Sequence, residues 1–329
     1  MLFAAIFLVS LSTLAFEVLL ARVFSIGQWN HLSFMVISIA LFGFAASGTF
    51  LSILDSRHKE WSLRLSGPAA PATISLLFTF TALFSFWALT ALPLDYFRLP
   101  IQPAQSAYLM TAYILLALPF FFSGLLIALG YAAAPQKSGL IYFATMGGSA
   151  CGAALPAILL PWFGEERLII ASVSLPLVFT LFFGLRHKPM RQRSAVTGLP
   201  RMLRIGPAIC AVILILSAGL LMSPMGSAII SVTPSPYKAL SQFLQFPNTT
   251  VVESTTGIRG RNERVKTPHI RFAPGISLKY TQALPQLHAI FRDGDYQFVF
   301  YHLGSPVAVQ FATHTVSFSG YHLVSNPQD

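Results

Sequence analysis

The chain has 329 residues, of which 54% are hydrophobic and only 10% are charged, and its formal net charge at pH 7 is +10. About 25% of the residues of a typical soluble domain are charged, so this composition excludes an ordinary soluble globular protein. It also excludes a disordered chain, which would be poor in apolar residues. The apolar residues are concentrated before position 225.

Seven nearly uncharged apolar runs precede that position. Crossing the hydrocarbon core of a bilayer, about 30 Å thick, takes about 20 helical residues. The runs are Leu2–Arg22, Leu32–Leu54, Ala72–Leu92, Ala107–Ala133, Leu140–Phe163, Leu168–Leu185 and Ile205–Met222. We therefore predict a mainly α fold, with a polytopic helical membrane bundle of about seven spans over residues 1–224. The predicted location is a cell membrane crossed several times, with the lipid bilayer as partner.

The connections between these runs differ in charge. Basic residues are costly to translocate and so mark cytoplasmic connections. The even-numbered connections contain Arg57, Lys59, Arg64, Lys137, Arg186, Lys188, Arg191, Arg193, Arg201 and Arg204, whereas the odd-numbered ones contain little beyond Arg22, Arg98 and Arg167. This predicts a cytoplasmic N-terminus and, with seven spans, a tail on the opposite side. The positive charge is explained by topology and by affinity for anionic lipid, so nucleic acid is not an expected partner.

Two charged residues fall in the first run, Glu17 and Arg22, about a turn and a half apart on a helix. A charge at the centre of a span costs about 2.5 to 3.5 kcal/mol, so the two residues are a candidate pair. Two interpretations stay open. In the structural one, Arg22 reaches the headgroups and Glu17 pairs with it or with a neighbouring helix. In the functional one, they form a proton or cation site. No other predicted span contains an acidic residue, which favours the structural interpretation.

Small residues mark the expected helix contacts. Gly148 and Gly152 form a GxxxG pair, which lets two helix backbones approach closely, and we interpret them as packing residues. Such small-residue faces also leave association with other membrane helices open. Cys151 and Cys210 lie inside predicted spans, where neither a disulfide nor a metal site is expected.

Residues 225–329 predict a small extramembrane β-rich domain. Ser235 can cap a helix that places Tyr237, Leu240, Phe243 and Leu244 on one face, either along the membrane or against the core of the tail. Three β-rich segments follow, at Thr250–Glu253, Glu263–Ile270 and Gln297–Tyr301, separated by turn formers at Gly257, Gly260, Pro274-Gly275 and Asp293-Gly294. This pattern predicts an antiparallel sheet.

The polar residues of the tail do not form a recognisable site. Asp293 and Asp295 flank Gly294 in a pattern typical of a β-turn. The five tail histidines, His269, His288, His302, His314 and His322, lack the spacing of zinc ligands. We therefore predict no catalytic, cofactor-binding or metal-binding residue in this chain.

Several segments resemble a known family. Phe16–Arg22, Phe24–Gly48, the SPYKALSQ segment at Ser235–Gln242, the RFAPGISL segment at Arg271–Leu278 and Phe291–Asp295 are similar, in order, to the membrane-anchored spermidine synthase-like proteins. The resemblance implies a multi-span anchor, then a small β domain, then a polyamine aminopropyltransferase-type domain that binds an S-adenosyl cofactor.

The chain departs from that family at its end. Gly320–Leu323 and Asn326-Pro327 resemble the run that leads into the cofactor-binding domain, but no glycine-rich loop follows a strand. We expect the anchoring and β-domain portion, truncated before the cofactor-binding domain, with no cofactor and no transferase activity alone. One conflict follows, because a tail outside the cytoplasm would lie away from the cytoplasmic S-adenosyl cofactor.

Two alternatives remain. One is a small multi-pass transporter or channel-like protein in which Glu17 matters. The transport alternative is weakened because the runs show no internal repeat, which transporters normally have. The other is a structural partner of another membrane protein, supported by the small-residue faces.

Overall fold

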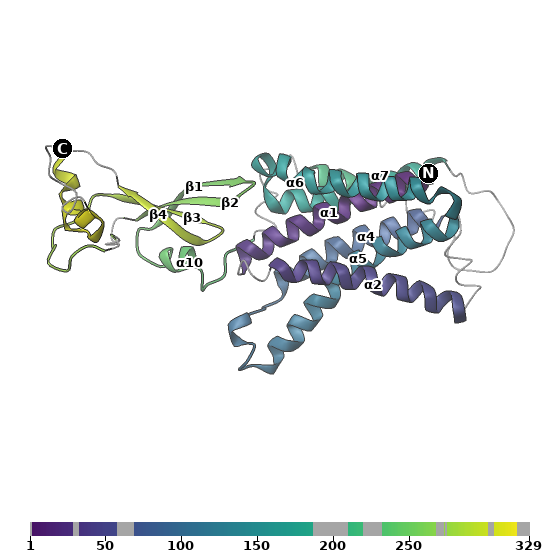
Figure 1. Ribbon diagram of the computed structural model, residues 1–329, viewed down its shortest axis with the longest axis horizontal. Helices are drawn as coiled ribbons and strands as arrows, with labels where there is room; N and C mark the ends of the chain where they lie inside the picture. Colours follow the sequence, from purple (N-terminus) through teal and green to yellow (C-terminus); the bar gives the residue numbers. More distant parts are fainter. Residues whose placement is uncertain are drawn as a thin grey trace. The chain divides into compact units, whose positions relative to one another are not determined.

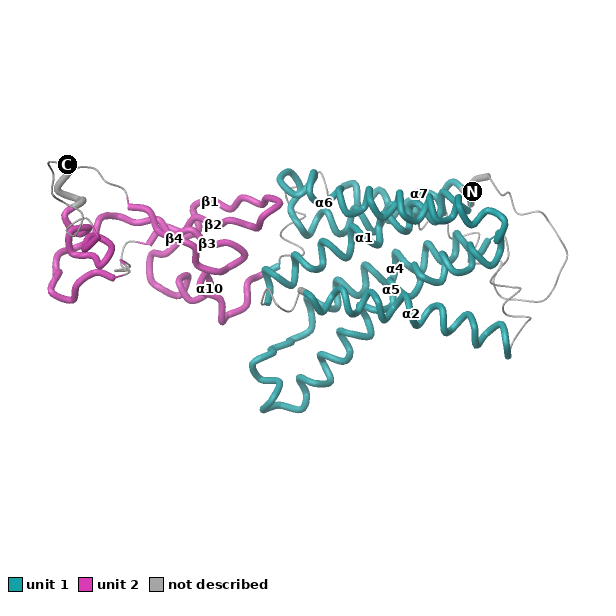
Figure 2. The backbone as a smooth tube through the Cα atoms, viewed as in Figure 1, with its two compact units in different colours: residues 1–232 teal, residues 233–329 magenta. Residues whose placement is uncertain are grey.

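The structure of the protein, a computed structural model, describes residues 2–28, 33–57, 69–186, 210–219, 232–267, 273, 275–301 and 306–320. The chain forms two compact units, residues 1–232 and 233–329 (Figure 2). The boundary therefore follows Val232, where the sequence had placed it after residue 224.

The first unit is helical (Figure 1). Its helices are α1 Leu2–Gly27, α2 Ser33–Arg57, α4 Ala70–Ala91, α5 Pro103–Ala133, α6 Ser138–Ser174 and α7 Pro176–Arg186, with short 3-10 turns η2 Tyr96–Arg98 and η3 Pro135–Lys137. In the described ranges, five helical segments are long and apolar enough to cross a membrane. The prediction of a membrane-type helical part is thus confirmed, but the count of about seven is not.

The difference in count has a local cause. The run Leu140–Phe163 and most of the run Leu168–Leu185 fall in one helical segment, Pro135–Phe182, which is interrupted at Gly164. The described helix within the seventh run, Cys210–Gly219, is shorter than a span. A straight helix of these 48 residues would be about 72 Å long at 1.5 Å per residue, more than twice the thickness of a hydrocarbon core.

This long segment folds back on itself at Gly164, whose φ of 73° and ψ of 171° are not helical. Before the break, Gly148 lies against Phe7 and Gly152 against Leu11, so the first arm runs parallel to α1. After the break, the Ser12 hydroxyl donates to the carbonyl oxygen of Ser172 at 2.7 Å. The second arm, which continues into α7, therefore runs back along α1.

Two hydrophobic clusters show how the other helices are directed. One contains the C-terminal half of α1 with Val36 of α2, Phe86 of α4 and Leu116 of α5. The other contains the N-terminal half of α1 with Phe78 of α4, Leu125 of α5 and Phe179 of α7. Consecutive helices therefore alternate in direction, counting the two arms of α6 separately.

The connections between helices consequently lie at two opposite ends of the bundle. We call one the basic end, where α1 begins, α2 ends at Arg57, η3 contains Lys137 and α7 ends at Arg186. We call the other the Glu165 end, where α1 ends, α4 is joined to α5 and α6 reverses.

The predicted GxxxG pair lies where α6 meets α1. A Cβ atom at Gly148 would overlap the carbonyl oxygen of Phe7, and one at Gly152 would overlap that of Leu11. Only the missing side chains allow this backbone approach, as expected of membrane helices packed through small residues.

We predict that Gly152→Ala destabilises the protein by about 1 to 3 kcal/mol, the cost of overpacking a close contact. The matched control is Gly139→Ala on the same helix, where no atom lies within 4 Å of the added Cβ; it should be neutral or stabilising, because alanine favours a helix by up to about 1 kcal/mol. Thermal unfolding in detergent measures both. Equal melting temperatures for the two variants would contradict the assignment.

The second unit contains a four-stranded antiparallel sheet in the order β1-β2-β3-β4. Its strands are β1 Thr250–Gly257, β2 Gly260–Thr267, β3 Leu287–Arg292 and β4 Asp295–Tyr301, followed by the 3-10 helices η4 Pro306–His314 and η5 Val316–Phe318. The sequence missed β3, and Ile270, where it ended a predicted strand, lies outside the described residues.

The predicted turn at Asp293-Gly294 connects β3 to β4. The φ values of Asp293 and Gly294 are 52° and 81°, and a two-residue loop with both values positive is the type I′ turn that fits the twist of a hairpin. This dipeptide was the sequence signal that a strand precedes it.

A short helix, α10 Ala239–Phe243, packs on one side of the sheet (Figure 1). Leu240 forms a core with Val265, Ala289 and Phe291. Of the two predicted positions for this helix, the one against the core of the tail is therefore confirmed. The predicted face is only partly right, because α10 begins after Lys238, and Tyr237 and Leu244 are exposed.

Candidate functional site

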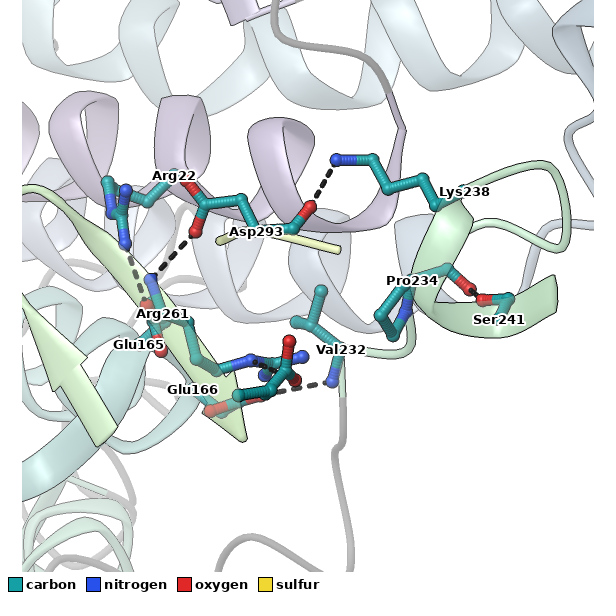
Figure 3. A network of polar contacts seen from close by, with 10 residues as sticks. Arg22, Glu165, Glu166, Val232, Pro234, Lys238, Ser241, Arg261 and Asp293 are labelled. Carbon is teal, nitrogen blue, oxygen red and sulfur yellow. Dashed lines mark hydrogen bonds and ion pairs between the residues drawn. The ribbon is translucent and has the colours of Figure 1, made fainter. Parts of the chain in front are cut away.

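Buried charges gather at the Glu165 end of the bundle. The Arg22 guanidinium Nη2 lies 3.2 Å from Glu165 Oε1, and the side chains are 15% and 1% exposed (Figure 3). Glu165 follows directly after the reversal at Gly164, while Arg22 lies in the last turns of α1. The ion pair therefore joins the end of α1 to the start of the second arm of α6.

The next residue, Glu166, holds the end of the first unit. Its Oε1 accepts a hydrogen bond from the backbone N–H of Val232 at 3.0 Å, and both residues are buried (Figure 3). Glu165 and Glu166 also occupy the first turn of the second arm, where a carboxylate interacts favourably with the helix dipole. Glu166 thus fixes the point at which the chain leaves the bundle.

The structure places the predicted pair differently from the sequence. Arg22 forms an ion pair with Glu165 and not with Glu17. Glu17 is half-buried on α1, and no hydrogen bond or ion pair connects it to another described residue. Sequence reasoning missed Glu165 and Glu166 because they fall between two apolar runs. A glycine followed by two acids at that position was the available signal for a helical hairpin.

The two carboxylates of this cluster make structural contacts. One carboxylate is neutralised by a guanidinium and the other accepts from the main chain, so each has a fixed partner. Among the described residues, no three His, Cys, Asp or Glu side chains could hold a metal ion. The cluster also lies at one end of the bundle, whereas transporter sites lie near the midplane of the bilayer.

We predict that Arg22→Met destabilises the bundle by about 3 to 5 kcal/mol, because it leaves the buried Glu165 without its partner. The control is Arg98→Met, which removes an ion pair to Asp95 whose side chains are 58% and 23% exposed and should cost at most about 1 kcal/mol. Thermal unfolding in detergent compares them. An Arg22→Met variant as stable as the control would contradict a buried ion pair.

A second buried charge lies in the tail unit. Lys238, 0% exposed, donates from Nζ to the carbonyl oxygen of Asp293 (Figure 3). Its Nζ also lies 3.4 Å from Asp295 Oδ2. The same turn is tied at two further points. Asp293 Oδ1 accepts from the N–H of Arg261 at 2.8 Å, and the Gly294 carbonyl accepts from the N–H of Leu240 at 3.0 Å. Lys238 therefore joins the start of α10 to the β3–β4 turn, and Asp293 is a turn residue.

Burial lowers the pKa of Lys238 below 10.5, and the nearby Asp295 carboxylate opposes this shift only in part. Below the lowered pKa both the folded and the unfolded states are protonated, so the cost of burying the charged amine is present in full. Between the two pKa values the unfolded state binds more protons, so stability rises with pH there.

We predict that the free energy of unfolding of the second unit rises with pH up to 10.5 relative to that of Lys238→Met. Urea unfolding of the full chain, followed by a fluorophore on a cysteine at position 250, measures this difference. Tyr296 and Tyr301, whose pKa burial also raises, are common to both proteins and cancel. The exposed Lys279→Met should behave as the wild type does. A difference independent of pH would contradict the prediction.

Comparison of the chain with known protein families, with curated proteins and with solved structures finds no match in any of the three. The candidate site is therefore interpreted from its own geometry.

Proposed function

We propose that this chain is a multi-pass membrane anchor that carries a small β unit, as its resemblance to the spermidine synthase-like membrane proteins implies, and that the β unit lies on the non-cytoplasmic side. The observation that carries the proposal is the position of Val232. Its N–H is bound by Glu166 at the Glu165 end, whereas α7 ends at Arg186 at the opposite, basic end.

These two positions indicate whether the chain crosses the membrane an odd or an even number of times. Six helical arms alternate in direction from Leu2 to Arg186, which lies at the basic end, whereas Val232 lies in the bundle core at the other end. These two positions lie at opposite ends of the bundle, and the apolar helix Cys210–Gly219 lies between them in the sequence. This supports a seventh crossing and hence the seven predicted spans.

The charge of the two ends supports an orientation. Arg57, Lys137 and Arg186 lie at the basic end. Since basic connections remain in the cytoplasm, the Glu165 end faces the other side. Thr233 follows Val232 directly, so the β unit emerges on that side. The proposal thus keeps the tail away from the cytoplasm and gives the chain an anchoring role without aminopropyl transfer of its own.

Cysteine accessibility in intact cells tests the topology with the full chain. In a Cys151→Ala, Cys210→Ala background, single cysteines replace Ser56 at the basic end, Ile101 at the Glu165 end or Leu278 in the β unit, all exposed. We expect a membrane-impermeant maleimide to label positions 101 and 278 from outside, and position 56 only after permeabilisation. Protection of position 278 together with labelling of 101 would contradict the seventh crossing.

A second experiment tests whether the chain alone transfers an aminopropyl group. The purified chain in detergent is incubated with a decarboxylated S-adenosyl aminopropyl donor and a polyamine acceptor, beside an active aminopropyltransferase. We expect product only in the control reaction. Turnover that co-purifies with the chain and is absent from a vector-only preparation would overturn the anchoring role.

A further inference from the structure

The sheet of the second unit has two chemically different faces, and we propose that the one opposite α10 docks on the anionic phospholipid headgroups of the bilayer that holds the bundle. The inference rests on the proposed membrane anchoring. We call this surface the outer face and define it by the residues Thr250, Glu253, Asn262, Arg264, Lys266, His288, Ile290, Arg292, Phe298 and Phe300.

The strand register assigns these residues to one face. Directly paired residues of an antiparallel sheet point to the same side. One row is Thr250, Lys266, His288 and Phe300, and the next is Glu253, Arg264, Ile290 and Phe298. The alternate residues Val265, Ala289 and Phe291 form the core with α10. The outer face is thus the side of the sheet that α10 does not cover.

The outer face has an excess of cations. Arg264, Lys266 and Arg292 lie on the two central strands. The carboxylate of Asp295, next to Arg292 in the register, contacts the buried Lys238. The remaining acid, Glu253, pairs with Arg264 at 3.1 Å on the edge strand. Lys266 is exposed, so at least one cation on this face is available to an anion.

Arg292 has a fixed position on this face. The Arg292 Nε donates to Asn262 Oδ1 at 3.3 Å. Its aliphatic stem lies against Gly260, where a Cβ atom would overlap Arg292 Cγ. The guanidinium is therefore held along the face of the sheet by its own strand partner, which reduces the entropy lost when it binds a phosphate.

Aromatic residues lie beside these cations. Phe298 is 55% exposed on the edge strand β4, and Phe300 contacts the ring of His288 edge to face at 5.4 Å between centroids. An aromatic ring next to basic side chains is the composition of surfaces that lie in the headgroup region, with the ring at the acyl boundary and the cations on phosphates.

The covalent connection favours lipid over a soluble anion. The second unit begins at Thr233, directly after the last residue of the membrane unit, so the bilayer surface is present at a high effective concentration. Each basic residue near an anionic surface contributes about 1 kcal/mol, or about a fivefold shift in the docking equilibrium. A few such contacts are sufficient for a tethered unit.

The experiment uses the full chain in liposomes, in the Cys151→Ala, Cys210→Ala background. A fluorophore is attached to a cysteine at Thr250, on the outer face, or at Ser254 of the same strand. Ser254 pairs with Glu263 and so points to the opposite face, and both positions are exposed. Quenching by lipids with brominated acyl chains is compared in phosphatidylcholine and in phosphatidylcholine with about 30% phosphatidylglycerol.

We expect stronger quenching at position 250 than at 254, only in the vesicles with phosphatidylglycerol, and weaker quenching at high salt. Lys266→Gln should shift the docking equilibrium about fivefold towards the free unit. The matched control Lys279→Gln, an exposed lysine outside the sheet, should leave it unchanged.

Four results would overturn the docking. Equal quenching at the two positions would show that no face is selected, equal quenching in both vesicle types would show that anionic lipid is not recognised, and equal effects of Lys266→Gln and Lys279→Gln would remove the outer face from the contact. A signal at position 250 that responds to a soluble oligonucleotide but not to lipid would also overturn it. Recovery of the chain in the liposome fraction shows that it is anchored in the membrane. The results above then count against the docking and not against the anchoring.

Discussion

The close approach of α1 to α6 is the contact on which the first unit depends. Helices in lipid gain little from the hydrophobic effect, so their association relies on packing and on hydrogen bonds between helices. Gly148 and Gly152 remove the side chains that would hold the two backbones apart. The Ser12 and Thr13 hydroxyls then bond to the second arm of α6 and to Ser123 of α5. α1 is thereby joined to three helical arms along its length.

This arrangement also determines where charge can be buried. The reversal at Gly164 interrupts the helical hydrogen bonds, and it lies at the end of the bundle beside the last turns of α1. Arg22 neutralises Glu165 there, and Glu166 accepts from the main chain of Val232. A buried ion is tolerated when it has such a partner and is costly without one. The charges therefore stabilise the reversal and the exit of the chain.

The second unit uses the same principle in a smaller core. The β3–β4 turn has two residues with positive φ, and the buried amine of Lys238 binds the carbonyl oxygen of the first. Because α10 is only five residues long, its apolar contacts alone cover little of the sheet. Lys238 and Leu240 together hold it on one face, which leaves the other face with its arginines, lysine and aromatic rings.

Much of this architecture was readable in the sequence because it depends on local patterns. Length and hydropathy of the runs predicted the helices, the GxxxG spacing predicted a close helix contact, and the Asp293-Gly294 dipeptide predicted a β-turn. The tertiary structure alone decided the partners. It paired Arg22 with Glu165, 143 residues away in the chain, and placed Lys238 under a turn 55 residues further on. A charged residue within an apolar helix indicates that burying it costs free energy. Which opposite charge pairs with it depends on how distant helices and strands pack, and no local spacing contains that information.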